Sequence, residues 1–307
     1  MKARRLAGFF ACVAALVAAT PALAQSAAPW QHDTLGQQGR ITLTPGFSPN
    51  GMTAWFAQTD CTPIGDCPQQ LSMSRLQNGV WSAPERVALP GGGRVDYPSV
   101  APDGRSVLFS WTGPHPMHGG RNVAEDFNLW RLGLEAGAEP EAIAGEDINR
   151  IREGRVARLR FVNNETAPVL TADGRLFFWT ERLDGPGERD IYAAAPDGQN
   201  GFEAPEPLAL STPGREDGAW VSPDGRLLLF TSPDRGGCGG SDIFASQWRD
   251  GAWSEPRNLG CDINSASDEG AATIRPGTGE LVFMSTRRAP GVDTWSLWSA
   301  PLPGWLR

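Results

Sequence analysis

Acidic residues recur in this sequence one to three positions ahead of short runs of small and apolar residues. They are Asp96, Glu165, Glu216, Asp217, Asp268 and Glu269. Carboxylates gathered at one place bind divalent cations, and paired carboxyl groups act as acid and base in glycoside hydrolysis. Because clustered like charges repel, such a set needs a cationic partner or strong local hydrogen bonds. Their chemistry therefore depends on whether the fold brings them together.

Other signals for catalysis or metal binding are weak. His115 and His118, with Glu125 and Asp126 nearby, form an H-x-x-H in a Gly- and Pro-rich loop. Without helical spacing this pattern is weak evidence for a metal site, and a solvated loop is the competing interpretation. The sequence has no G-x-S-x-G elbow, no H-E-x-x-H and no phosphate-binding loop. It therefore assigns no catalytic residues.

Five similar segments must position the acids. Each contains a short strand, an Asn-Gly, Asp-Gly or Thr-Gly turn and an apolar strand, which is the pattern of a β-hairpin. The segments begin at Thr44, Tyr97, Ala167, Gly218 and Ala271. A third strand follows each hairpin, as in DIFAS at Asp242, and a fourth follows in most units, as in WSEPRNLG at Trp253.

Repeated four-stranded units predict an all-β protein, a β-propeller of five blades. The turn residues of successive hairpins are 53, 70, 51 and 54 positions apart. Six blades are the alternative, but the excess of the long interval is too short for four strands. The fifth unit lacks its outer strand, and the segment at Trp30 is placed to supply it. An N-terminal strand would then complete the last blade and close the ring.

The stretch SPDGRLLLFTS, followed by SDIFAS and GAWSEPRNLG, resembles the TolB-like, WD-type β-propeller repeat of exported bacterial proteins. The resemblance extends over nearly the whole chain after residue 24. It implies binding and scaffolding in the periplasm more often than catalysis, and it supplies no catalytic residues.

Residues 1–24 have the features of a secretory signal peptide. A basic start precedes an apolar run, and Ala22-Leu23-Ala24 provides a cleavage site. We expect cleavage near Ala24, a periplasmic or secreted protein, and one propeller domain over 25–307. No later apolar stretch approaches the ~18 residues of a membrane span, and the formal charge of -8 argues against nucleic acid as a partner.

Four cysteines follow the signal peptide, and an even number in an exported chain predicts two disulfides. Cys61 and Cys67 would close one loop locally, whereas Cys238 and Cys261 would join a loop to the entry of the next blade. The loops between second and third strands vary most between units. They open on the same face as the acids, and we call this face the loop-rich face.

Two arginine–aspartate combinations bracket such loops. Arg182 with Asp190 and Arg235 with Asp242 are predicted to form ion pairs that close them.

Two interpretations of the acids remain open. They are turn residues that accept hydrogen bonds from neighbouring N–H groups, or they form an incomplete ring that attracts a basic peptide, calcium or another divalent cation. Apart from such a cation, no cofactor is predicted.

We therefore predict a monomeric, non-catalytic propeller that binds a protein, peptide or small ligand on its loop-rich face. The alternative is a propeller-fold hydrolase of the glycosidase kind, with carboxylates at the central channel. Sugar-stacking aromatic residues are scarce on the predicted innermost strands, where Trp220 is the exception. Their scarcity favours binding over hydrolysis.

Overall fold

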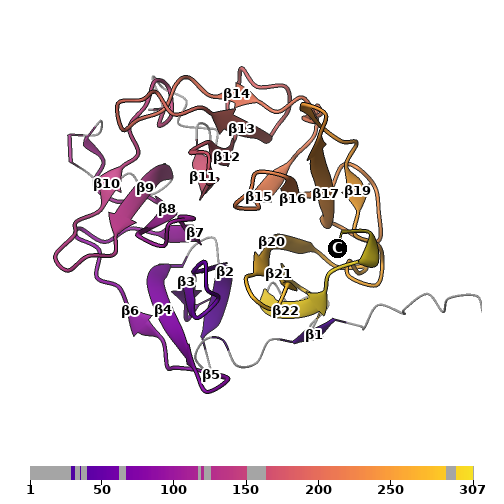
Figure 1. Cartoon of the computed structure of the whole chain (residues 1–307), viewed down its shortest axis with the longest axis horizontal. Coiled ribbons are helices and arrows are strands. Elements are labelled where there is room, and N and C mark those ends of the chain that lie inside the picture. Colours follow the sequence, from indigo (N-terminus) through magenta and orange to yellow (C-terminus); the bar gives the residue numbers. More distant parts are fainter. Residues whose placement is uncertain are drawn as a thin grey trace, which may run out of the picture.

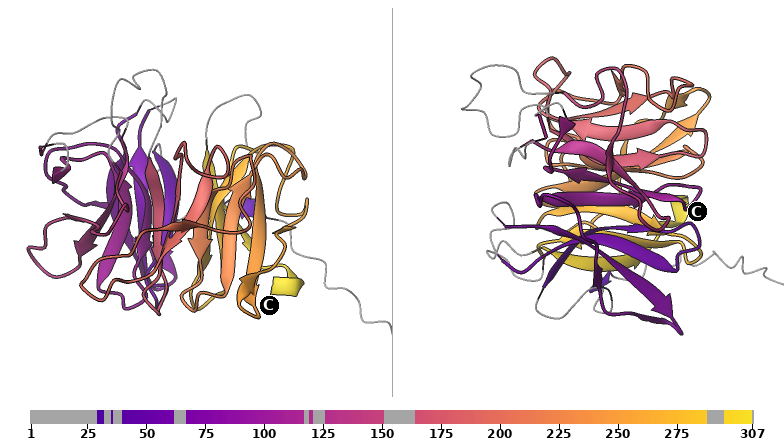
Figure 2. Two further views of the ribbon diagram at one scale, coloured as in Figure 1. Left: turned by 90° about the horizontal axis from the view of Figure 1, so that it is seen from above. Right: turned by 90° about the vertical axis from the view of Figure 1, so that its left-hand side faces the viewer.

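A computed structural model describes residues 29–31, 35, 40–61, 67–116, 119–120, 126–150, 164–287 and 295–306. The described residues form five antiparallel sheets arranged around a central axis (Figure 1). The side views in Figure 2 show the strands running between the two faces of a disc. The prediction of an all-β, five-bladed propeller is confirmed, and the alternative of six blades is wrong.

Each blade has an inner strand beside the axis, followed outwards by a second and a third strand. The inner strands are β2 (Ile41–Phe47), β7 (Val95–Val100), β11 (Glu165–Leu170), β15 (Asp217–Val221) and β20 (Glu269–Arg275). The second strands are β3 (Thr53–Thr59), β8 (Ser106–Trp111), β12 (Leu176–Thr180), β16 (Leu227–Ser232) and β21 (Glu280–Ser285). The third strands are β4 (Gln70–Gln77), β9 (Asn128–Gly133), β13 (Asp190–Ala194), β17 (Asp242–Arg249) and β22 (Ser296–Pro301).

The outermost strands contain two residues each. They are β1 (Trp30–Gln31), β5 (Val80–Trp81), β6 (Glu85–Arg86), β10 (Glu141–Ala142), β14 (Glu206–Pro207), β18 (Ala252–Trp253) and β19 (Arg257–Asn258). A short 3-10 helix, η3 (Gly304–Leu306), follows β22. The strand β1 pairs antiparallel with β22, with Trp30 opposite Ser299 and Gln31 opposite Trp298. The last blade is therefore built from both ends of the chain, as predicted.

The core lies between the blades, because each second strand is covered on both faces. Every residue of β8 and of β12 is buried. Phe177 and Trp179 of β12 pack with Leu228 and Phe230 of β16 in one apolar cluster that spans two blades. Burial of these large side chains holds neighbouring sheets together around the ring.

Each inner strand contains a β-bulge near its start. The bulge puts one residue at positive φ, and these residues are Thr44 (47°), Tyr97 (47°), Ala167 (57°), Gly218 (58°) and Ala271 (49°). An L-residue in this region costs about 1–2 kcal/mol. Hydrogen bonds between blades offset part of the cost, since the Ala167 amide donates to Ser110 Oγ at 2.9 Å and the Tyr97 amide to Thr44 Oγ1 at 3.1 Å.

The inner strands of the first two blades approach closely at Gly46. A Cβ atom at this position would lie 2.2 Å from the carbonyl oxygen of Pro98. We expect Gly46→Ala to lower the free energy of unfolding by about 2 kcal/mol, because β2 and β7 would have to separate. In urea unfolding, Gly304→Ala is the control, since no atom lies within 4 Å of its added Cβ. Equal losses in the two variants would contradict the close approach.

Candidate functional site

The six acidic residues do not form one ring. Relative to the bulge residue of each blade, Glu165, Glu216 and Glu269 stand two positions earlier, Asp96 and Asp217 one, and Asp268 three. Consecutive side chains of a strand point to opposite faces. The three glutamates therefore point in a different direction from Asp96 and Asp217. Several of these acids belong to the inner strands rather than to the loops before them.

The three glutamates are completely buried and each pairs with an arginine that follows the second strand of its own blade. The pairs are Glu165–Arg182, Glu216–Arg235 and Glu269–Arg287, each at 3.1 Å. Each arginine also donates to a main-chain carbonyl in the loop that enters the blade, at Ile148, Leu210 and Ile263 respectively. We call these three arrangements the arginine clasps. They join inner strand, second strand and entry loop.

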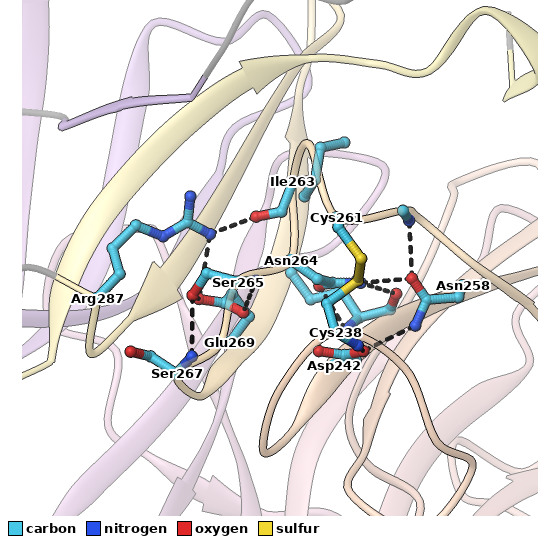
Figure 3. Close-up of a disulfide and its surroundings, with 12 residues drawn as sticks. Cys238, Asp242, Asn258, Cys261, Ile263, Asn264, Ser265, Ser267, Glu269 and Arg287 are labelled. Atoms are coloured by element: carbon cyan, nitrogen blue, oxygen red, sulfur yellow. Dashed lines mark hydrogen bonds and ion pairs between the residues drawn. A yellow bond between two sulfur atoms is a disulfide. The ribbon is translucent and has the colours of Figure 1, made fainter. Parts of the chain in front are cut away.

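The clasp of the last blade is shown in Figure 3. Both oxygens of Glu269 are occupied: Ser265 donates from its amide and its hydroxyl, and Ser285 donates from its hydroxyl, each at 2.6 Å. Arg287 completes the set. These are the contacts that the hydrogen-bonding interpretation of the acids predicts, and they leave little room for a cation at Glu269.

The predicted ion pairs Arg182–Asp190 and Arg235–Asp242 are wrong. Asp190 instead accepts a hydrogen bond from the Gly187 amide at 2.9 Å, and Asp242 accepts one from the Cys238 amide at 2.6 Å. Each aspartate begins a third strand and fixes the loop before it through the main chain. The arginines are thereby left for the buried glutamates.

The two predicted disulfides are present. Cys61 is bonded to Cys67, and Cys238 is bonded to Cys261 (Figure 3). The second disulfide joins the β16–β17 loop to the β19–β20 loop, which enters the last blade. Residues 62–66, 121–125 and 288–294, which stand in sequence between the second and third strands of three blades, lie outside the described residues.

The histidine hypothesis concerns residues that are only partly described. His115 is buried, and its ring meets that of Trp130 edge-on with centroids 5.4 Å apart. Of its proposed co-ligands, Asp126 is buried, whereas His118 and Glu125 lie outside the described residues. Within the described ranges, no three His, Cys, Asp or Glu side chains stand together so as to hold a metal ion.

A group of ionisable side chains surrounds Arg189, towards the loop-rich face. Arg189 donates to Glu181 Oε1 at 2.8 Å and to Asp217 Oδ2 at 2.7 Å, so one guanidinium bridges two carboxylates. Burial raises the pKa of Glu181 to about 7, against the lowering effect of Arg189. The guanidinium lies 5.1 Å from the ring centre of Trp179, which the ring of Tyr97 meets edge-on at 6.3 Å. Tyr97 thus reaches from the second blade towards the third and fourth.

Asp96 is held between the first two blades. Its Oδ1 accepts hydrogen bonds from the Thr44 hydroxyl at 3.0 Å and from the Tyr97 amide at 2.9 Å. Burial raises the pKa of Asp96 from 3.8 to about 6, and these two bonds and the charge of Arg94 only partly oppose it.

We expect Asp96→Asn to stabilise the protein increasingly as the pH rises. The raised pKa means that Asp96 supports the fold most below its unfolded pKa and loses this contribution as the pH passes about 6. The amide keeps an acceptor for Thr44 and Tyr97 without the charge. Between pH 4 and pH 7.5 the free energy of unfolding of the variant should gain about 1–3 kcal/mol on the parent in urea titrations. A difference that does not change with pH would contradict burial as the cause.

A cavity of about 540 Å³ occupies the centre of the propeller. Inner strands of all five blades line it, from Thr44 and Tyr97 at the bulges to the turns of the hairpins. Its lining reaches the exposed turn residues Pro49, Pro223 and Asp224, so the cavity opens there. We call this end of the disc the hairpin face. It lies opposite the loop-rich face.

The wall of the cavity is mainly apolar. Its side chains include Phe47, Val169, Trp220 and Ile274, together with prolines and small residues. Among the described lining residues, Asp224 is the one that carries a charge. None of the six predicted acidic residues lines this cavity. The sequence did contain a signal for this cavity: the bulge residues of three blades, Ala167, Gly218 and Ala271, are too small to fill the axis.

Comparison with known proteins identifies the class of fold. No family model and no curated protein matches the sequence. Among solved structures, the α-L-arabinofuranosidase from Lactobacillus brevis superposes with a TM-score of 0.55 and 12% identity, over 85% of this chain and 91% of that chain. TolB from Acinetobacter baumannii superposes with a TM-score of 0.46 and 16% identity, over 84% of this chain and 54% of that chain.

The gluconolactonase XC5397 from Xanthomonas campestris gives a TM-score of 0.45 and 15% identity, over 87% of both chains. This chain spans about half the length of the TolB structure. At such identities the likeness shows the fold alone. The chain is a five-bladed β-propeller, and function must be argued from its own side chains.

Proposed function

We propose that this chain is an exported, non-catalytic β-propeller of the TolB-like kind that binds a ligand in its central cavity, through the hairpin face. The cavity is the observation that carries the proposal. Its volume of about 540 Å³ falls in the range of small-molecule sites, which are mostly apolar with few polar groups. The loop-rich face is less favoured, because its buried glutamates already have partners within the chain.

Export is supported by the disulfides, which persist in oxidising compartments. The proposed signal peptide, residues 1–24, lies outside the described residues, and the proposed domain extends over 25–307. In the part of the chain that the structure describes, no helix is long and apolar enough to cross a membrane.

A cavity-filling variant tests the proposal. The oxidised protein, produced from Gln25 onwards, would be screened by calorimetry against small compounds with apolar bodies. Val100→Phe enlarges a half-buried side chain on the cavity wall, whereas Ala252→Leu changes an exposed residue that does not line the cavity. Loss of binding in the first variant and retention in the second are expected, with folding checked by circular dichroism. Equal binding to both variants would place the site elsewhere.

A second candidate, a glycosidase-like hydrolase, is favoured by the group around Arg189. Glycosidases need one carboxyl group that is protonated and one that is ionised. Glu181 and Asp217 place two carboxyl groups around one guanidinium, and burial raises the pKa of Glu181 to about 7. Hydrolysis of chromogenic glycosides, abolished by Glu181→Gln, would establish this activity; no turnover over a broad glycoside panel would dismiss it.

A further inference from the structure

We infer that the ligand of the central cavity is an amphiphilic organic cation, with an apolar body inside the cavity and an ammonium group at Asp224. The inference rests on the proposed function and adds the chemical class of the ligand. It follows from the distribution of polar groups along the cavity wall.

The inner part of the cavity offers few free polar groups. The hydroxyl of Thr44 is bonded to Asp96, and that of Ser99 donates to the carbonyl oxygen of Pro168. Trp220, half-buried on β15, adds an aromatic face to the wall. A polar group buried without a hydrogen bond is costly. Within the described residues, Thr273 Oγ1 and Trp220 Nε1 on the wall have no hydrogen bond. The part of a ligand that fills this space should therefore be mainly apolar, with few polar atoms.

The mouth of the cavity differs from the interior by a carboxylate. Asp224 is exposed in the turn between β15 and β16, where its Oδ1 accepts hydrogen bonds from the Ser222 hydroxyl and from the Arg226 amide. Within the described residues, Asp224 forms no ion pair and its Oδ2 has no hydrogen bond. This oxygen can accept a bond from a ligand.

The equivalent turn of the third blade shows the contrast. Asp173 is paired with Arg175 at 2.9 Å and does not line the cavity. A cation at the cavity mouth would thus find its partner at Asp224, while its apolar body lies against the cavity wall. Arg175 lies beside the neighbouring Gly225, where an added Cβ atom would be 2.6 Å from its Nη2, but its ion pair is with Asp173. An anionic group at the cavity mouth would be repelled by the Asp224 carboxylate. The formal charge of -8 further favours the approach of cations.

Three compounds with the same indole body separate the contributions of shape and charge. Tryptamine carries an ammonium group, 3-ethylindole is neutral and indole-3-propionate is anionic. In calorimetric titrations at low salt we expect tryptamine to bind about tenfold more tightly than 3-ethylindole, and indole-3-propionate to bind most weakly. Salt should reduce the difference.

Matched variants locate the charge effect. Asp224→Asn should reduce the affinity for tryptamine to that for 3-ethylindole, whereas Asp173→Asn should change neither. Asp224→Ser, which keeps a polar side chain in the turn, replaces the amide variant if the latter does not fold. Equal affinities of all three compounds, unchanged by either Asp224 variant, would overturn the cation inference and leave the cavity proposal standing. Absence of binding by all three, or binding that Val100→Phe does not affect, would overturn both.

Discussion

Arg182→Met is expected to lower the free energy of unfolding by about 3–5 kcal/mol, the largest effect among single substitutions considered. The side chain of Arg182 is buried and donates to the carbonyl oxygens of Asp147 at 2.7 Å and Ile148 at 3.0 Å, as well as to Glu165. Its removal leaves a buried carboxyl group without its cation, and two carbonyl groups without a donor. Each of these groups gave up its hydrogen bonds to water on folding, so without Arg182 its desolvation is no longer compensated.

The pH dependence identifies the cause of this loss. Burial raises the pKa of Glu165 well above its usual range, although Arg182 opposes the rise. A carboxyl group with a raised pKa stabilises the fold at low pH and loses that contribution as the pH rises. Without Arg182 the pKa of Glu165 rises further, so the destabilisation should be larger at pH 8 than at pH 5.

Urea unfolding at these two pH values measures the effect. Arg175→Met is the control, because Arg175 forms a more exposed pair with Asp173 and should contribute less than about 1 kcal/mol. A loss as small as that of the control, or one independent of pH, would contradict the role of the arginine clasp.

Loss of the Cys238–Cys261 disulfide is expected to cost about 3 kcal/mol, which is the second large effect. The bond spans 23 residues, and in the chain-entropy model its removal raises the conformational entropy of the unfolded chain and so favours unfolding. It also anchors the loop that carries Asn264, whose side chain accepts from the Ile243 amide at 2.9 Å, and Ser265, which donates to Glu269. Its loss should therefore loosen the clasp of the last blade.

The paired variant Cys238→Ser/Cys261→Ser, compared with Cys61→Ser/Cys67→Ser by urea unfolding, measures this contribution. The Cys61–Cys67 disulfide spans 6 residues and should contribute about 2 kcal/mol. A larger loss from the short disulfide than from the long one would show that chain entropy does not govern these bonds.

The architecture could be predicted because its signals are local and repeated. Each Asp-Gly or Asn-Gly turn fixes a hairpin, and five agreeing copies fix the number of blades. The role of Trp30 followed from counting strands, and its pairing with Ser299 confirms it. The cysteine pairing followed from the faces on which the hairpin repeats place the loops.

The contacts of the acids could not be predicted, because they depend on single-residue offsets. Glu216 and Asp217 are adjacent and point in different directions, and nothing in the sequence shows which of them meets Arg235. The arginine partners were missed for a related reason. Arg235 lies nearer in sequence to Asp242 than to Glu216, but the hairpin brings it to the glutamate. The cavity could not be predicted either, because its shape depends on how all five inner strands are placed around the axis.

A crystallographic fragment screen on the oxidised protein tests the central claim most directly. We expect apolar and cationic fragments to gather in the central cavity, between Trp220 and the turn that carries Asp224. Fragments bound at the loop-rich face, with the cavity left without any, would contradict it.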